Sequence, residues 1–276
     1  MIFETHTLAS PLSDSIESIF YFKNFQPEHE IERVVPTGHI FLIFELDGIE
    51  RCTYNNDTLE PLERFKNVWI SGMHSNYLSI SAVKNSEMLV VQFKTLGAHP
   101  FLNHPVSNIT NKVIPAESLF GDNIMSLRRA IINTPSVSKK FELIETWLTS
   151  RFSKDALPSN ELVAIYNNIA QASVNKHSEV VKTYSKTQKH LISQFKKYVG
   201  LTPKVLHRIL RFNALLGNIH QKDILSWAQI ADEFGYTDQS HFIKEFKEFS
   251  GFNPEEFIKQ DYQDNEPNFF PIDKKG

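Results

Sequence analysis

Two nearly identical phrases stand in the last third of this 276-residue chain. FKKYVGLTP ends at Pro203, and FKEFSGFNP ends 51 residues later, at Pro254. In each phrase a glycine stands where a helix ends and can take a positive φ, and Thr-Pro or Asn-Pro supplies the N-cap and first residue of the next helix. Each phrase therefore predicts a junction between two helices, and the repeat predicts two copies of one helical unit.

The residues before the second phrase predict a short helix, a tight turn and a longer helix. WAQIADEFG gives the short helix, with Trp227, Ile230 and Phe234 on its buried side. GYTDQS then supplies a glycine turn and Thr237 as the N-cap of the helix that ends at Gly251. A short helix, a glycine-containing turn and a longer helix form the helix-turn-helix pattern.

The first copy follows the same plan less closely. Thr187 takes the place of Thr237, and Val180 and Val181 stand in the short helix, but the turn TYSKT has no glycine. Between the copies, residues 203–217 predict a helix long enough to hold the two units a fixed distance apart. Two rigidly joined units can enter successive major grooves on one face of a DNA duplex.

Charge is unevenly distributed along the chain, although the whole carries only −3. Residues 176–211 contain nine basic residues and one acidic residue, whereas residues 223–261 contain three basic and nine acidic residues. Such asymmetry marks an interaction surface. We therefore expect the first unit to supply most of the attraction to an anionic partner.

The first part of the chain has the pattern of a β-rich domain. The stretches HIFLIFEL, NVWISGM, YLSISAV and MLVVQFK are short, apolar and separated by turn residues, which predicts a sandwich or barrel. Helical periodicity over Asp122–Asn133 and Ser138–Phe152 predicts two helices after the strands, and SKDALPSN predicts the hinge between the two domains.

The chain is therefore predicted to be an α+β protein of two domains. A β-rich regulatory domain with flanking helices covers residues 1–155. An all-α domain covers residues 160–262 and contains two helix-turn-helix motifs joined by a linker helix. Residues 263–276 are predicted to form a frayed tail.

IADEFGYTDQSHFIKEFKEFSGFNPEEF closely resembles the second helix-turn-helix signature of AraC/XylS-type transcription regulators. That resemblance spans about residues 165–262, and stretches such as VVPTGHIFLIFELDG are similar to the regulatory region of a subgroup of the family. It implies a cupin-like N-terminal domain that binds a small effector or forms a homodimer. It also implies a sequence-specific regulator of promoters that binds the major groove of double-stranded DNA and, if it is an activator, contacts RNA polymerase.

The expected DNA contacts lie on the outward faces of the two longer helices, because Leu191, Phe195, Phe242 and Phe246 must face inward. Lys189 and Ser193 are the expected base readers, and Lys196 is expected to contact the backbone. Arg208 and Arg211 on the linker helix either touch phosphate or form salt bridges. The full expected set is Gln188, Lys189, Ser193, Lys196, Arg208, Arg211, Gln239, Ser240, His241 and Lys244.

An effector would lie in the mouth of the barrel, among aromatic residues such as Phe41, Phe44, Trp69 and Phe93. The same four residues equally fill a core that holds no ligand. The helix over Ser138–Phe152 is the candidate dimer contact.

Little in the sequence indicates an enzyme, a metalloprotein or a membrane protein. There is no H-x-H pair and no glycine-rich phosphate loop, so no catalytic residue, metal or cofactor is expected. Cys52 is the single cysteine, the longest apolar run is too short to cross a bilayer, and no secretory signal opens the chain, which together indicate a cytoplasmic location. The competing interpretation is a protein-interaction module with weak or lost DNA binding, suggested by the acidic second unit and by Ser193, where the family often has arginine.

Overall fold

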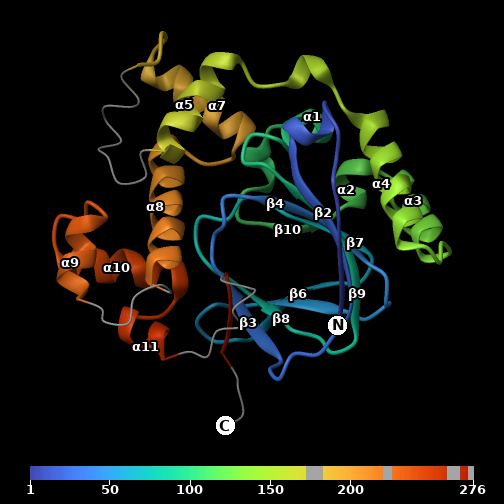
Figure 1. Cartoon of the computed structure of the whole chain (residues 1–276), viewed down its shortest axis with the longest axis horizontal. Helices are drawn as coiled ribbons and strands as arrows, with labels where there is room; N and C mark the ends of the chain where they lie inside the picture. Colours follow the sequence, from blue (N-terminus) through green and yellow to red (C-terminus); the bar gives the residue numbers. More distant parts are fainter. Residues whose placement is uncertain (172–182, 220–225, 260–267, 273–276) are drawn as a thin grey trace.

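The computed structural model describes residues 1–171, 183–219, 226–259 and 268–272 (Figure 1). A β-rich N-terminal domain lies beside a helical C-terminal domain, as the sequence predicts. The β-rich domain is a sandwich of two antiparallel sheets. The larger sheet contains, in spatial order, β1 (Ile2–His6), β2 (Ile16–Phe25), β9 (Ser86–Phe93), β4 (Ile40–Glu45), β7 (Val68–Ser71) and β10 (Val113–Pro115). The smaller sheet contains β11 (Phe269–Pro271), β3 (Ile31–Val34), β8 (Leu78–Ser81), β5 (Arg51–Tyr54) and β6 (Pro61–Phe65).

Both faces of the larger sheet are covered, which explains why β4 is an unbroken apolar run. Successive side chains of a strand point to opposite faces. Leu42 and Phe44 belong to the main core, which continues into the flanking helices, whereas Ile43 clusters with Phe65 of the smaller sheet. The flanking elements are α1 (His99–Leu102), α2 (Glu117–Phe120), α3 (Asn123–Ile132) and α4 (Val137–Arg151), with short turns η1 (Leu12–Asp14), η2 (Val106–Ile109) and η3 (Lys154–Ala156).

The C-terminal domain is built around one long helix, α8, on which both longer helices of the repeat pack. Phe212 of α8 contacts the rings of Phe246 and Phe249 in α10. No helix in the described part of the chain is long and apolar enough to cross a membrane. The helices are α5 (Asn160–Gln171), α7 (Gln188–Tyr198), α8 (Pro203–Ile219), α9 (Trp227–Glu233), α10 (Gln239–Ser250) and α11 (Pro254–Ile258).

The junctions of the repeat have the predicted backbone geometry. Gly200 and Gly251 take φ of +87° and +75°. Asn253 forms a capping box with Glu256 at the start of α11, and the Thr187 side chain caps α7. Val180 and Val181, the predicted short helix of the first unit, lie outside the described residues.

The predicted N-cap of α10 was wrong by one residue. Asp238, not Thr237, caps the helix, because its carboxylate accepts the backbone N–H of His241 at 2.8 Å. An ionised carboxylate is the stronger acceptor and also favours the positive end of the helix dipole. The correction leaves the residues exposed on α10 unchanged.

The predicted frayed tail was also wrong over its apolar part. Residues Phe269–Pro271 form β11, which pairs antiparallel with Glu32–Val34 of β3. Phe270 is fully buried and its ring lies 4.7 Å from that of Phe257 in α11. Residues 269–271 therefore belong to the N-terminal sandwich, although they follow the helical domain in sequence.

Replacing Gly251 with alanine should lower the free energy of unfolding by about 1–2 kcal/mol, because φ is positive and a Cβ would lie 2.7 Å from Arg33. Gly217 is the matched control, since it lies in α8 and a Cβ there meets nothing. Gly217→Ala should instead stabilise the helix by about 0.5–1 kcal/mol. Urea unfolding of the two variants measures both effects, and changes of the same sign would contradict this account.

Candidate nucleic-acid interface

The α7 helix presents a polar face to solvent. Gln188, Lys189, Ser193 and Lys196 are exposed, while Leu191 and Phe195 on the opposite side are fully buried. Three lysines and no acidic residue lie within the helix. The face therefore combines positive charge with side chains able to donate to and accept from base edges.

The α10 helix presents an equivalent face. Gln239, Ser240, His241 and Lys244 are exposed, while Phe242 and Phe246 are fully buried. Both helices thus expose their N-terminal halves, where backbone N–H groups point outward and the helix dipole favours a phosphate.

Two arginines of the expected contact set are engaged inside the domain. Arg208 Nε and Arg211 Nη2 each lie 2.6 Å from one oxygen of the Glu245 carboxylate. Arg208 Nη2 also contacts Glu248 at 2.6 Å, and the Arg211 guanidinium lies 3.9 Å from the centre of the Tyr236 ring. Of the two uses the sequence left open for these arginines, the structure places both in salt bridges between α8 and α10.

Glu245 was missed by sequence reasoning, because its partners lie 34 and 37 residues away and no local pattern links them. Its side chain is 2% exposed. Burial alone would raise the pKa of Glu245, but hydrogen bonds and attraction from Arg208 and Arg211 hold it below its ordinary value. The carboxylate is therefore ionised at neutral pH and joins the two helices.

This network changes where the acidity of the second unit lies. Glu245 and Glu248 both pair with Arg208 of α8. The charged side chains that α10 exposes to solvent without an ion pair in the described structure therefore include Lys244 and Lys247. Among the described residues, the other exposed acids of this region are Asp238, which caps α10, and four residues on α9 and α11: Asp232, Glu233, Glu255 and Glu256. The α10 helix is therefore less acidic than the sequence segment that contains it.

The four aromatic residues proposed for an effector do not come together. Phe44 and Phe93 are fully buried in the main core, whereas Phe41 and Trp69 lie on the face toward the smaller sheet. Trp69 donates to Glu45 at 2.8 Å. The four residues therefore lie on two opposite faces of the larger sheet, with Phe41 and Trp69 together on the face toward the smaller sheet.

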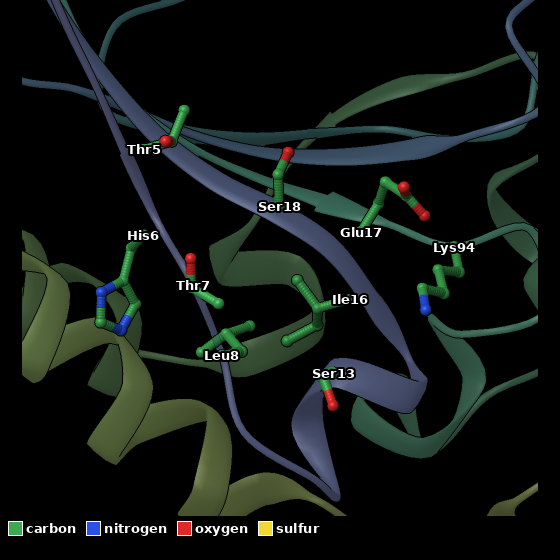
Figure 2. A pocket seen from close by; sticks show the side chains of 9 residues that line it. All are labelled: Thr5, His6, Thr7, Leu8, Ser13, Ile16, Glu17, Ser18 and Lys94. Carbon is green, nitrogen blue, oxygen red and sulfur yellow. The ribbon is translucent and has the colours of Figure 1, made fainter.

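Two solvent-open pockets lie in the N-terminal domain, and none of these four aromatic residues lines either. The first, about 400 Å³, lies between β1 and β2 and is lined by residues that include His6, Glu17 and Lys94 (Figure 2). His6 is 2.7 Å from Glu145 and stacks on Phe141, so α4 holds its ring. The second, about 620 Å³, opens between the sheets, beside His74, Tyr77 and Lys112 among others.

The described residues contain no group of three or more side chains that could hold a metal ion. Among the histidines, His29 pairs with Glu32 at 3.0 Å and His39 contacts the carbonyl of Phe93. Cys52 is half-buried, with its thiol donating to the carbonyl of Thr53. These contacts give each of the three side chains a structural use.

Two family models each match one part of the chain. Residues 181–260 match the profile of a helix-turn-helix domain, and residues 4–115 match a domain of unknown function, DUF6597. No curated protein sequence matches the chain.

Among solved structures, those of ToxT from Vibrio cholerae are similar in arrangement. An apo lysine variant of ToxT from strain SCE256 has a TM-score of 0.46 and 11% identity, covering 87% of this chain and 96% of that one. Wild-type ToxT from the same strain, with an unsaturated fatty acid bound, has a TM-score of 0.43 and 14% identity, covering 87% and 93%. ToxT from Vibrio cholerae O395 has a TM-score of 0.45 and 12% identity, covering 88% and 97%.

Proposed function

We propose that this chain, a DNA-binding transcription regulator with an AraC-type helix-turn-helix domain over residues 181–260, reads the bases of its operator with the N-terminal halves of α7 and α10 and contacts phosphate with Lys196 in the last turn of α7. The observation that carries this proposal is the equivalence of the two helices. Each begins at a capped residue, exposes polar side chains over its first two turns, and ends at a glycine with positive φ.

The proposed contact set follows from exposure. It keeps the exposed members of the sequence prediction, which are Gln188, Lys189, Ser193, Lys196, Gln239, Ser240, His241 and Lys244. Arg208 and Arg211 are left out, because Glu245 and Glu248 already pair with them and contact with phosphate would break these pairs. Their proposed role is to hold α10 on α8.

Removing charge from α7 should weaken DNA binding more than removing it from α10. We expect Lys189→Ala and Lys196→Ala each to raise the Kd about five-fold at 0.15 M salt and to lower the salt slope by about one, because each substitution removes a positive charge that is attracted to the phosphates. Lys244→Ala should change the Kd less, since acidic residues flank its helix. Duplexes selected by the full chain from a random-sequence pool supply the operator for titration.

Lys84→Ala is the matched control, because Lys84 is exposed on a turn of the N-terminal domain and should not change the Kd. Equal losses for all three helix variants would contradict the proposed division between the units. A wild-type chain that enriches no sequence would favour the competing role, a protein-interaction module.

The N-terminal domain is proposed to act on this DNA-binding domain by binding a small effector or a second copy of the chain. The same proposal holds that the chain is cytoplasmic, has no catalytic role and, if it is an activator, contacts RNA polymerase. Phe41 and Trp69 remain candidates for an effector surface, because both lie toward the smaller sheet. If the DNA recovered with the protein from cells is enriched in one class of promoters, the genes controlled by those promoters would indicate the effector.

A further inference from the structure

The N-terminal domain holds both helix junctions of the repeat. The hydroxyl of Thr110 donates to the carbonyl of Gly200 at 3.1 Å, and Arg33 Nη1 donates to the carbonyl of Gly251 at 3.1 Å. The two glycines occupy corresponding positions in the repeated phrase. Equivalent carbonyls at the ends of α7 and α10 therefore each accept a hydrogen bond from the other domain.

The first junction is closely packed against the loop that follows α1. The η2 turn packs on α7, and the ring of Tyr198 meets His99 edge-on at 4.8 Å. A Cβ at Gly200 would lie only 2.3 Å from the Thr110 hydroxyl. Glycine is therefore needed there for the approach of the N-terminal domain as well as for its positive φ.

The second junction is held by a stacked arginine. The Arg33 guanidinium lies between two rings, 4.7 Å from Tyr77 of its own domain and 4.6 Å from Phe252 of the helical domain. It also donates to the carbonyl of Asn56 at 3.4 Å. A planar cation stacked on two rings and bonded to the Gly251 carbonyl has a fixed orientation, which a lysine could not reproduce.

These contacts hold the C-terminal ends of α7 and α10, which are opposite to the proposed base-reading ends. The α7 helix has 11 residues and α10 has 12, so each exposed end lies roughly 15 Å from its anchored glycine. If a helix rotates slightly about its anchored glycine, the side chains at its base-reading end move several times farther than the side chains beside the glycine. Both anchors belong to one sandwich, which couples the two helices independently of α8.

From this geometry we infer that Arg33 and Thr110 are positioning residues for DNA recognition. They fix the orientation of α7 relative to α10, and with it the separation between the two DNA elements that the protein accepts. The inference rests on the proposed function, because it assigns the reading role to these two helices. The alternative is that α8 alone sets the geometry through Arg208, Arg211 and Glu245.

Distance measurements on the protein without DNA distinguish the inference from this alternative. Nitroxide labels at Lys189→Cys and Lys244→Cys, in a Cys52→Ser background of the full chain, report the separation of the two reading ends by pulsed electron paramagnetic resonance. We expect one narrow distance distribution in the parent and at least a two-fold broader one after Arg33→Met combined with Thr110→Val. An unchanged distribution would overturn the inference and assign the geometry to α8.

The matched control combines Arg64→Met with Thr146→Val. Arg64 is an exposed arginine of the same domain that pairs with Glu50, and the Thr146 hydroxyl donates to the carbonyl of Glu142 in its own helix. The control makes the same chemical changes away from both junctions. Its distribution should equal that of the parent, and equal broadening in control and test would also overturn the inference.

A DNA experiment tests the functional consequence. The starting duplex is one selected by the parent chain, and the altered duplex has two base pairs inserted between the contacted elements. The insertion should weaken binding of the parent at least ten-fold. It should weaken binding of the Arg33→Met, Thr110→Val chain less than three-fold. A role in stability alone would weaken binding to every duplex by the same factor, which would contradict the inference. A parent chain that enriches no sequence would contradict the proposed function instead, and the label distances would still decide how the helices are held.

Discussion

Replacing Glu245 with alanine is expected to destabilise the second helix-turn-helix unit by about 3–5 kcal/mol. The carboxylate is almost fully buried and satisfies both Arg208 and Arg211, so its loss leaves the buried Arg211 guanidinium without its ionised partner. Hydrogen exchange of the α10 amides measures the effect, because opening of α10 from α8 should become easier by the same free energy.

Glu248→Ala is the control for this variant. Glu248 pairs with the same Arg208 at the same distance, but it is 39% exposed, so its loss should cost less than about 1 kcal/mol. Similar exchange in the two variants would show that burial does not set the strength of the network. Because the folded pKa of Glu245 is lowered, its contribution is present at neutral pH and is lost as the pH falls through that value.

The junctions could be predicted from the sequence because their signals are local. A cap, a glycine and a proline within four residues determine where one helix ends and the next begins, and Gly200, Gly251 and Asn253 behave accordingly. The exposed faces of α7 and α10 follow from the same helical periodicity. These two features define most of the proposed DNA interface.

The remaining features depend on contacts between distant segments, which periodicity does not encode. Arg33 meets Gly251 across 218 positions, and β11 pairs with β3 although its few apolar residues follow a polar stretch. Charge totals were misleading for a related reason. They count Glu245 as part of an acidic surface, whereas tertiary packing turns it toward the arginines of α8. Sequence therefore predicts the helices and their ends, while the packing decides which charges remain for a partner.

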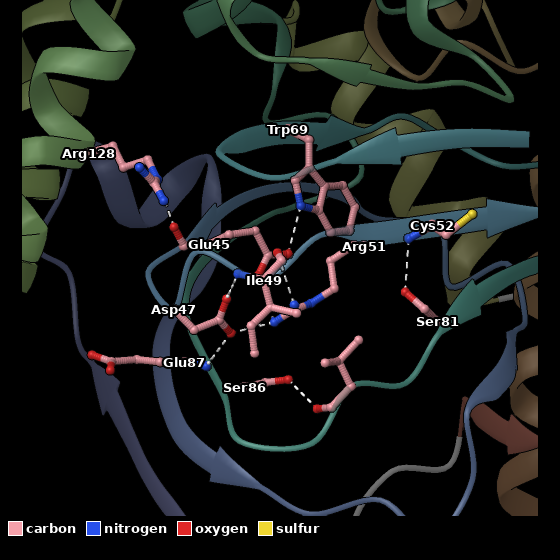
Figure 3. Close-up of polar contacts among 11 residues, drawn as sticks. Glu45, Asp47, Ile49, Arg51, Cys52, Trp69, Ser81, Ser86, Glu87 and Arg128 are labelled. Carbon is pink, nitrogen blue, oxygen red and sulfur yellow. Dashed lines mark hydrogen bonds and ion pairs between the residues drawn. The ribbon is translucent and has the colours of Figure 1, made fainter.

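A second buried carboxylate lies at one end of the sandwich, where polar groups converge on Glu45 (Figure 3). Its carboxylate is 3.0 Å from Arg51 and accepts the indole N–H of Trp69 at 2.8 Å. Arg51 also contacts Asp47 at 2.6 Å, and Arg128 of α3 donates to the backbone carbonyl of Glu45. Arg51 is therefore shared between two carboxylates, which leaves Glu45 incompletely neutralised.

Burial raises the pKa of Glu45 to about 7, despite the opposing attraction of Arg51. Since this folded value lies above the ordinary 4.5, folding favours the protonated carboxyl. The contribution of this group to stability is complete below about pH 4.5 and is lost as the pH rises to about 7, a change of about 3 kcal/mol. Burial lowers the pKa of His74 to about 4, so that group acts in the opposite direction, losing stability as the pH falls.

Comparison of wild type with Glu45→Gln separates the two groups, because His74 is present in both chains. Glutamine keeps an acceptor for Trp69 and stays neutral, so we expect similar stability near pH 4.5 and a variant that is more stable by about 3 kcal/mol near pH 8. Urea unfolding followed by tryptophan fluorescence suits the measurement, since Trp69 and Trp147 both belong to the N-terminal domain. The opposite result would be a difference in the free energy of unfolding between the two chains that stays constant from about pH 4.5 to pH 8. It would mean that the pair with Arg51 already holds Glu45 ionised at pH 4.5, and that this charge stabilises the sandwich.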